Sequence, residues 1–271
     1  MGLIHRFAEP VRARPSDLAP GGWLRPHDAD LAVVAVDDAP WHGQRVGVLA
    51  LQGAFAEHRV ALTRLGCVAV DIRTPEQLRT VDALAMPGGE STTMSKLLAS
   101  SGLFDALAAR LDEGLPVFGT CAGMILLARE IADGRPDQRS FNAIDLCVRR
   151  NGYGRQVDSF EADLAVAGLD APFRAVFIRA PKVESHGPTV EVLATCDETA
   201  VLVRGGAAGN ILCASFHPEL TSDTRIHQLF LSFAFPNTSS SNASSTSVSN
   251  SSPKPSSNPS SNSEEIRHVR P

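Results

Sequence analysis

The sequence contains few cysteines and few aromatic residues. Its 271 residues include 5 cysteines, 2 tryptophans and 1 tyrosine, and aromatic side chains make up only 6%. The cysteines are odd in number, lie far apart and never form a Cys-x-x-Cys pair, which argues against a disulfide framework and against a zinc knuckle. Scarce aromatic side chains argue against a surface on which nucleic-acid bases would stack.

Long hydrophobic runs and an excess of positive charge are also missing. No apolar stretch approaches the roughly 20 residues that cross a bilayer. The early apolar run at 31–36 is too short for a secretion signal and is followed by two aspartates. The chain carries 25 Lys and Arg against 30 Asp and Glu, which argues against a nucleic-acid-binding surface. We therefore expect a cytoplasmic protein with neither a membrane nor a nucleic-acid partner.

Composition divides the chain into three segments. Residues 1–44 contain scattered proline, glycine, arginine and aspartate with little periodicity, and residues 236–271 are dominated by serine, asparagine and proline. Segments with so little apolar surface to bury cannot offset the entropy of ordering the chain. We predict a poorly ordered N-terminal extension at 1–44, a folded domain at 45–235 and a disordered tail at 236–271.

Residues 45–235 alternate strand patterns with helical ones. Short apolar runs predict strands at 46–51, 68–72, 83–86, 116–119, 164–166, 175–178, 190–194, 200–203 and 211–216. Helical spacing of apolar residues predicts helices at 55–65, 92–98, 103–111, 122–131 and 223–233. Strands that alternate with helices imply an α/β fold, whose mostly parallel sheet is covered by helices on both faces. In such sheets ligands bind at the carboxyl ends of the strands.

A candidate nucleophile follows the strand predicted at 116–119. Residues 119–123 read Gly-Thr-Cys-Ala-Gly, which is the thiol counterpart of the G-x-S-x-G nucleophile elbow. Free backbone N–H groups at the start of the next helix favour a thiolate at Cys121 and can hold an oxyanion. The alternative is a buried cysteine in a glycine-bounded turn.

A candidate base follows the strand predicted at 211–216. His217 is separated from Glu219 by one proline, so the imidazole can act as a general base while the carboxylate fixes its tautomer. The alternative is an exposed loop histidine, which is what we expect of the other histidines among the 8 in the chain.

A third candidate site is the turn at 87–92, with the sequence Pro-Gly-Gly-Glu-Ser-Thr. Two glycines allow the backbone to approach a ligand, and Ser91 or Thr92 can cap the helix that follows. The turn lacks the lysine and the spacing of a phosphate-binding loop, so nucleotide binding is not expected. The alternative is a plain turn with a helix cap.

Together these sites suit nucleophilic catalysis, and their sequences resemble those of class I, or triad, glutamine amidotransferases. Within that class the chain resembles the glutaminase subunits of pyridoxal 5′-phosphate synthase. The matching stretches, in the family's order, are VLALQGA at 48–54, PGGESTTM at 87–94, FGTCAG at 118–123, NGYGRQVDSFEADL at 151–164, FIRAP at 177–181 and SFHPELT at 215–221. The resemblance covers residues 46 to 233, and neither terminal segment has a counterpart in the family pattern.

The resemblance implies a role for each matching residue. It makes Cys121 the nucleophile, His217 the general base and Glu219 the residue that orients the base. The positions that it assigns to glutamine binding are Gly89, Glu90, Ser91, Arg150, Ile178 and Arg179. A guanidinium suits the α-carboxylate of glutamine, and which arginine meets it stays open. The backbone N–H groups of Gly89 and Ala122 are the oxyanion-hole candidates, and Gly53 is an adjustable third.

The resemblance further implies a single flavodoxin-like domain that hydrolyses L-glutamine to L-glutamate and ammonia without a metal or organic cofactor. The ammonia would pass to a separate barrel-shaped synthase subunit for pyridoxal phosphate (vitamin B6) synthesis. The alternatives are a glutaminase subunit of another amidotransferase, a γ-glutamyl hydrolase and a non-catalytic flavodoxin-like binding protein. The stretches PGGESTTM and GRQVDSFEADL oppose the first two, and the complete Cys-His-Glu set opposes the third.

Overall fold

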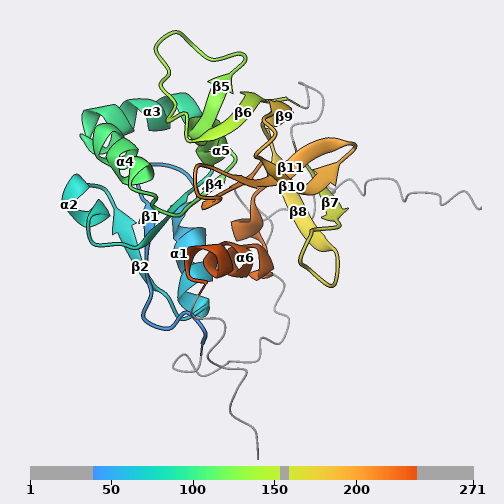
Figure 1. Ribbon diagram of the computed structural model, residues 1–271, viewed down its shortest axis with the longest axis horizontal. Helices are drawn as coiled ribbons and strands as arrows, with labels where there is room; N and C mark the ends of the chain where they lie inside the picture. Colours follow the sequence, from blue (N-terminus) through green and yellow to red (C-terminus); the bar gives the residue numbers. More distant parts are fainter. Residues whose placement is uncertain (1–38, 153–158, 237–271) are drawn as a thin grey trace, which may run out of the picture.

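A seven-stranded sheet forms the centre of the computed structural model (Figure 1), which describes residues 39–152 and 159–236. The strand order is β10-β11-β12-β4-β3-β1-β2. Neighbouring strands from β12 to β2 are parallel, while β11 and β10 continue the sheet in antiparallel pairs. The strands are β1 Arg45–Leu49, β2 Val68–Ile72, β3 Ala83–Met86, β4 Val117–Thr120, β10 Glu191–Cys196, β11 Thr199–Gly205 and β12 Ile211–Ala214.

The central strands are apolar on both faces because both faces are covered. Every residue of β3 and β4 is buried. Along β3, Ala83 and Ala85 pack into one core, while Leu84 and Met86 pack into the other. Successive side chains of a strand point to opposite faces, so a parallel sheet between two helical layers requires such a continuous apolar run.

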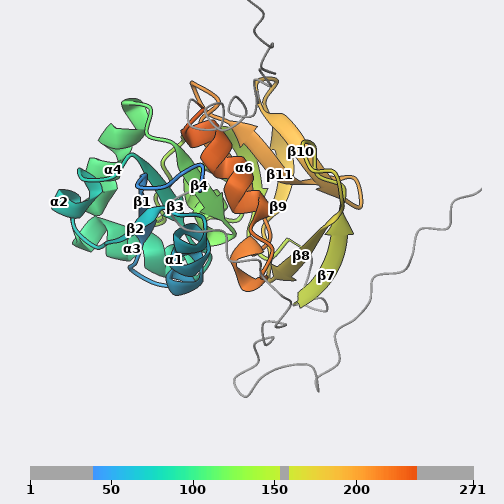
Figure 2. The same cartoon turned by 90° about the horizontal axis from the view of Figure 1, so that it is seen from below.

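Helices cover the two faces of the sheet, as Figure 1 and Figure 2 show from two directions. On one face, Leu62 of α1 and Phe230 of α6 share a core. On the other, Met94 of α3, Leu107 of α4 and Leu126 of α5 share the second core. The helices are α1 Phe55–Arg64, α2 Pro75–Leu78, α3 Ser91–Ser100, α4 Leu103–Asp112, α5 Ala122–Leu127 and α6 Arg225–Ala234. The predicted α/β architecture is therefore confirmed.

Two smaller sheets lie beside the central one. β5, β6 and β9 form the first, and the antiparallel pair β7 and β8 forms the second. Their strands are β5 Ala128–Ile131, β6 Ile144–Arg149, β7 Ser159–Leu164, β8 Phe173–Ile178 and β9 Lys182–His186. β6 and β9 are not among the predicted strands, and the strand predicted at 164–166 instead ends at residue 164.

The helix predicted over 122–131 is wrong in its second half. α5 ends at Leu127, and Ala128 adopts the extended angles φ −59° and ψ 150°. From Ala128 onward the chain pairs with β6 as strand β5. Pairing with a distant segment therefore overrides the helical spacing of the apolar residues, which is a local signal only.

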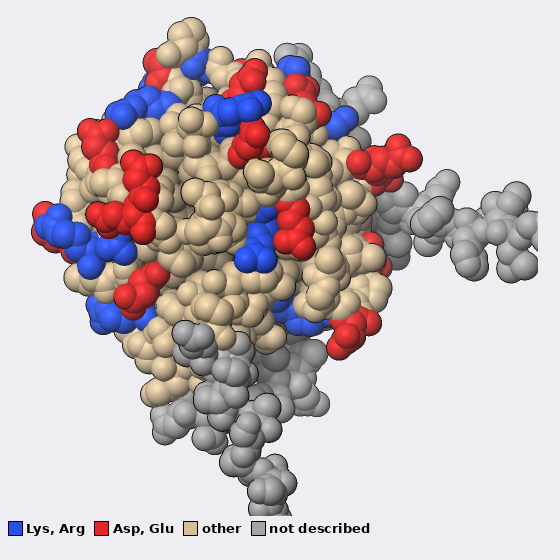
Figure 3. Space-filling view, in the orientation of Figure 1, with Lys and Arg blue, Asp and Glu red and all other residues tan. Residues whose placement is uncertain are grey.

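Acidic and basic side chains are interspersed on the face that Figure 3 shows. The described residues on this face form no broad basic patch of the kind that binds a phosphate backbone. Within residues 39–152 and 159–236, no helix combines the length and the apolar content needed to span a bilayer.

The folded part of the chain begins before the predicted boundary at residue 45. The side chain of Trp41 is only 8% exposed and belongs to the core beneath α1 and α6. The amide of Gly43 donates to the carbonyl of Gly66, and the amide of Val68 donates to the carbonyl of Gln44. These contacts join residues 41–44 to the domain. The other residues of the two predicted terminal segments, 1–38 and 237–271, lie outside the described residues.

The two tryptophans offer a matched test of this boundary. We expect Trp41→Ala to lower the free energy of unfolding by about 3–5 kcal/mol, because it empties a large buried volume. Trp23→Ala changes the same residue type within the segment that the sequence places outside the domain, so its unfolding curve should match that of the unmodified chain. Urea titration measures both, and an equal loss in the two variants would contradict the boundary.

Candidate active site

Cys121 occupies a strained turn between β4 and α5. Its backbone adopts φ 48° and ψ −101°, a region that residues with a side chain rarely enter. The turn is possible because its neighbours are small: a Cβ atom at Gly123 would lie 2.2 Å from the carbonyl oxygen of Met86. At Gly119 a Cβ would lie 2.8 Å from the backbone of Gly123. These contacts explain the glycines of the G-x-C-x-G motif physically.

His217 and Glu219 lie at the end of β12, where the chain enters the short helix η3, Pro218–Leu220. The amide of His217 donates to the carbonyl oxygen of Val176 in β8. The imidazole Nδ1 lies 2.8 Å from Oε1 of Glu219, within hydrogen-bonding distance. Both side chains are almost fully buried, which fixes the ring and the carboxylate in one arrangement.

The structure brings Cys121 and His217 together across the sheet edge. The thiol of Cys121 lies close enough to the imidazole of His217 to raise its pKa. Gly88, in the turn after β3, packs against both: a Cβ there would lie 2.2 Å from Cε1 of His217 and 3.3 Å from Cβ of Cys121. Three turns that follow parallel strands therefore meet at one point, as the carboxyl ends of such strands are expected to do.

Electrostatic attraction outweighs burial at the His217–Glu219 pair. Burial alone would lower the pKa of His217, but the charge of Glu219, the neighbouring Cys121 and the hydrogen bond that the imidazole donates to Glu219 raise this pKa well above 6.5. Burial would raise the pKa of Glu219, but attraction to His58 and His217 lowers it to about 2. The carboxylate is therefore ionised, and the imidazole holds a proton more firmly than it does in water.

The other described cysteines lie in environments that disfavour a thiolate. Burial raises the pKa of Cys67 to about 12, and it also raises the pKa of Cys213. The pKa values of Cys147 and Cys196 are raised first by burial and then by neighbouring carboxylates. Since thiolates and not thiols are nucleophilic, Cys121 beside His217 is the best candidate for reaction.

The segment predicted to bind glutamine forms the start of α3. Glu90 is the N-cap, and its carboxylate accepts hydrogen bonds from the amides of Thr92 and Thr93. Although partial burial acts in the opposite direction, a hydrogen bond from the hydroxyl of Thr93 and these two hydrogen bonds from amides lower the pKa of Glu90 to about 2. Ser91 is buried and accepts a hydrogen bond from Nε2 of Gln138.

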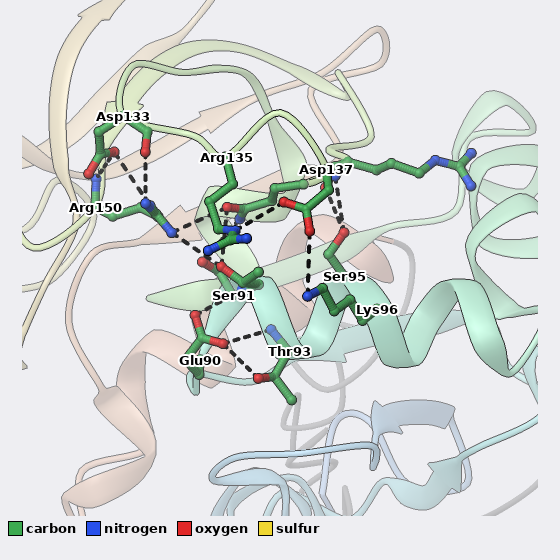
Figure 4. A network of polar contacts seen from close by, with 12 residues as sticks. Glu90, Ser91, Thr93, Ser95, Lys96, Asp133, Arg135, Asp137 and Arg150 are labelled. Carbon is green, nitrogen blue, oxygen red and sulfur yellow. Dashed lines mark hydrogen bonds and ion pairs between the residues drawn. The ribbon is translucent and has the colours of Figure 1, made fainter.

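Arg150 points to the same helix end, as Figure 4 shows. Its guanidinium donates to the carbonyl oxygen of Asp133, to Oγ1 of Thr92 and, at 3.4 Å, to Oε1 of Gln138. Gln138 therefore connects Ser91 with Arg150, and both are residues that the family resemblance assigns to binding of the substrate glutamine. Gln138 and Asp133 are not among the predicted site residues, because they lie in a polar loop whose composition carries no distinctive signal.

The three backbone amides predicted for an oxyanion hole lie around the same turns. The amide of Ala122 belongs to the first residue of α5, and such amides have no acceptor within their own helix. Gly53 adopts φ +92°, and a Cβ there would lie 1.8 Å from the carbonyl oxygen of Gly88. Next to Gly89, Oε1 of Gln52 accepts a hydrogen bond from the amide of Glu90.

Ile178 and Arg179 lie at the end of β8, close along the chain to the carbonyl of Val176 that holds His217. Arg179 adopts a positive φ of 43° and is exposed, while Ile178 is partly buried. No described contact joins the side chain of Arg179 to the triad. Residues 153–158, from the matching stretch NGYGRQVDSFEADL, lie outside the described residues.

The expectation that the remaining histidines are exposed is wrong for two of them. His58 on α1 and His227 on α6 are fully buried; His58 lies beside Glu219, and His227 lies beside His58. Their helices carry a signal that would have found them: His58 precedes Ala61 and Leu62 at the spacing of one buried helical face. A histidine on such a face is either a packed core residue or part of a polar network.

Comparisons with known proteins match this chain to one family. The SNO glutamine amidotransferase family matches residues 48–234. The pyridoxal 5′-phosphate synthase subunit PdxT of Mycobacteroides abscessus is 58% identical over 186 residues, which cover 69% of this chain and 95% of that protein. The subunit of the same name from Thermosipho africanus is 52% identical over 188 residues, which cover 69% of this chain and 97% of that protein.

Solved structures agree with the sequence relatives. A crystal structure of a glutamine amidotransferase matches with a TM-score of 0.66 and 52% identity, covering 70% of this chain and 98% of that one. The structure of PurLQS from Thermotoga maritima matches with a TM-score of 0.52, covering 71% of this chain and 99% of that one. At 14% identity, the second match concerns the fold alone.

Replacing Glu219 should change the titration of His217. The raised pKa means that proton binding by His217 stabilises the fold below about pH 6.5, and that this contribution is lost as the pH rises through the folded-state value. In Glu219→Gln the attraction is gone while burial remains, so we expect His217 to titrate at a lower pH than in the unmodified chain. Nitrogen NMR of the imidazole measures this midpoint.

Glu184→Gln is the matched control, because Glu184 pairs with Arg149 away from the triad. It should leave the titration of His217 unchanged. An unchanged midpoint in Glu219→Gln itself would show that the carboxylate does not set the protonation of His217.

Proposed function

The chain belongs to the SNO glutamine amidotransferase family, and we propose that it acts as the glutaminase subunit of a pyridoxal 5′-phosphate synthase, with Cys121, His217 and Glu219 as its catalytic triad. The reaction is hydrolysis of L-glutamine to L-glutamate and ammonia. The observation that carries the proposal is the placement of Cys121 beside an imidazole, both packed against Gly88, with Nδ1 of that imidazole held by a buried carboxylate.

The first half of the reaction forms a thioester. Because Glu219 occupies Nδ1 of His217, Nε2 is the nitrogen left to face Cys121. The thiolate of Cys121 attacks the side-chain amide carbon of glutamine, and the amide oxygen becomes an oxyanion. When the C–N bond breaks, His217 gives its Nε2 proton to the departing nitrogen, which leaves as ammonia.

The second half hydrolyses the thioester. His217, now neutral, takes a proton from a water molecule as this water attacks the γ-glutamyl carbon. Collapse of the second tetrahedral intermediate breaks the C–S bond and releases glutamate, and the enzyme regains the thiolate beside protonated His217. No metal ion or organic cofactor takes part in these steps.

We assign glutamine to the space between the triad and the start of α3. Gly89, Glu90, Ser91, Ile178 and the two arginines Arg150 and Arg179 form its surroundings in this proposal. The position of Arg150, held by Asp133, Thr92 and Gln138 beside Ser91, supports it as the arginine that meets the α-carboxylate. The amides of Gly89 and Ala122 would receive the oxyanion, with Gly53 as the adjustable third donor.

The ammonia is proposed to pass to a barrel-shaped synthase subunit, since the relatives named PdxT are subunits of pyridoxal 5′-phosphate synthase. Ammonia released into neutral water would take up a proton and lose its nucleophilic lone pair, so direct transfer preserves its reactivity. We place the reaction in the cytoplasm and in the domain at 45–235, together with the residues around Trp41 that pack on it.

Replacing the nucleophile tests the chemistry. We expect Cys121→Ala to lower glutamine hydrolysis by at least about 10³-fold, because a nucleophile and its base act as a unit. Cys67→Ala is the matched control, since Cys67 is 5% exposed and Cys121 is 6% exposed. Glutamate release, with the synthase subunit present, measures both. Full activity in Cys121→Ala would exclude the proposed nucleophile.

Dependence on the synthase subunit tests the partner. The segment after β1 is held in place by two contacts, from the amide of Ala54 to the carbonyl of Gly88 and from the amide of Glu90 to Oε1 of Gln52. Glycine at position 53 lets its peptide reorient at little steric cost. If docking of the synthase subunit rotates the Gly53 amide toward the oxyanion position, glutamine hydrolysis at saturating glutamine should rise by about 10²–10³-fold. Equal turnover without the synthase subunit would indicate a free-standing hydrolase.

A further inference from the structure

A pair of buried histidines lies behind the triad and has no part in the chemistry described so far. His58 and His227 are 0% exposed, and so is the side chain of Glu219. Nε2 of His58 lies 3.4 Å from Oε2 of Glu219 and 3.1 Å from Oγ1 of Thr120, while Nδ1 of His58 lies 3.0 Å from Nε2 of His227. The four side chains form one contiguous polar group in an otherwise apolar core.

The ionised carboxylate decides which nitrogen of His58 carries the proton. Oε2 of Glu219 can only accept a hydrogen bond, so a lone pair on Nε2 of His58 facing it at 3.4 Å would be repelled. Nε2 of His58 therefore carries the hydrogen. Nδ1 is then an acceptor, which makes Nε2 of His227 the donor to it. The result is a chain of donors that runs from His227 through His58 to Thr120, beside Oε2 of Glu219.

His58 is the group that faces the second oxygen of this carboxylate. Oε1 of Glu219 is taken by His217, whereas Oε2 is buried and has no well-aligned hydrogen-bond partner among the described residues. The hydrogen of His58 is directed at Oγ1 of Thr120, the closer and better-aligned acceptor, with Oε2 of Glu219 beside it. An ionised carboxylate without hydrogen-bond donors is costly to bury, so the imidazole of His58 affects the stability and the orientation of the Glu219 carboxylate.

The electrical neutrality of His58 keeps the charge of Glu219 directed at His217. Burial lowers the pKa of His58, although the charge of Glu219 acts in the opposite direction, and burial lowers the pKa of His227 to about 3. A second imidazolium beside Glu219 would compete with His217 for its charge. A neutral imidazole that donates to Thr120 and packs beside Oε2 holds the carboxylate in place without this competition.

The rings of His58 and His227 are fixed by packing as well. Each lies edge-to-face with Phe118 of β4, at centroid distances of 5.8 Å and 5.6 Å. The contact of His58 with Thr120 adds a link to the residue that precedes Cys121. No group of three or more metal-binding side chains that could hold a metal ion occurs in the described parts of the chain, so the cluster is a hydrogen-bonded network.

We propose that His58 is a positioning residue, held by His227, which fixes Glu219 and the end of β4 in the arrangement that His217 and Cys121 require. This inference rests on the proposed glutaminase function and adds residues from α1 and α6 to its machinery. Neither histidine touches glutamine in this arrangement, so each acts through Glu219 and Thr120.

The test compares His58→Leu with His58→Gln in glutamate-release kinetics, with the synthase subunit present. Leucine removes the donor, so kcat should fall by about 10- to 100-fold, the cost of losing a hydrogen bond near a charged group. KM should stay unchanged, because glutamine is not contacted. Glutamine at position 58 offers an N–H in place of Nε2 and should restore most of kcat.

A double-variant cycle separates positioning from general structural damage. If His58 acts through Glu219, His58→Leu should cause little further loss in the Glu219→Gln background. Leu62→Val, a change at a fully buried apolar site on the same helix, should leave kcat unchanged in both backgrounds. If His58→Leu does not fold, His227→Leu removes the upstream donor, and the same fall in kcat and the same coupling to Glu219 are expected.

Unchanged kcat in a folded His58→Leu variant, or an equal loss in the presence and absence of the Glu219 carboxylate, would overturn the proposal. Either result would leave the proposed function intact as long as the unmodified chain hydrolyses glutamine. An inactive unmodified chain with the synthase subunit present would instead refute the proposed function itself.

Discussion

The charge on Glu219 has no solvent around it, so each group that faces it must replace the water that it has lost. His217 does so at one oxygen, and His58 lies beside the other. The attraction raises the proton affinity of His217, and the contact with Thr120 extends the same network to the strand that ends at Cys121. The geometry of the nucleophile, the base and the orienting carboxylate thus depends on one buried ion pair and its neighbours.

Local patterns were sufficient to predict the parallel part of the fold. Continuous apolar runs such as 83–86 occur where both faces of a strand are buried, and they are readable because burial acts on every residue of the run. Of the smaller sheets only β8 was predicted, as the strand at 175–178. β5 at Ala128–Ile131 was missed because it follows α5 without a turn signal and forms only by pairing with a distant strand. Such pairing is a tertiary effect that residue spacing does not encode.

The residues of the candidate site also fall into those that local sequence predicts and those that it does not. Cys121 could be predicted because its strained turn requires neighbouring glycines. His217 could be predicted because the carboxylate that orients it lies only two residues away in the sequence. His58, His227 and Gln138 act through contacts with residues far away in the sequence, such as the contact between Gln138 and Ser91, 47 positions apart. Their residue types are ordinary ones for helices and loops, so the fold is needed to recognise them.

The sheet separates two apolar cores, and the triad is built across that partition. Cys121 is attached to α5, whose side chains lie in the core with α3 and α4, whereas the histidines behind Glu219 come from α1 and α6 in the opposite core. A ligand seated at the sheet edge is thereby linked to the stability of both layers, because loosening either one displaces part of its site. Ligand binding at the site would therefore make the two helical layers unfold in a single cooperative transition.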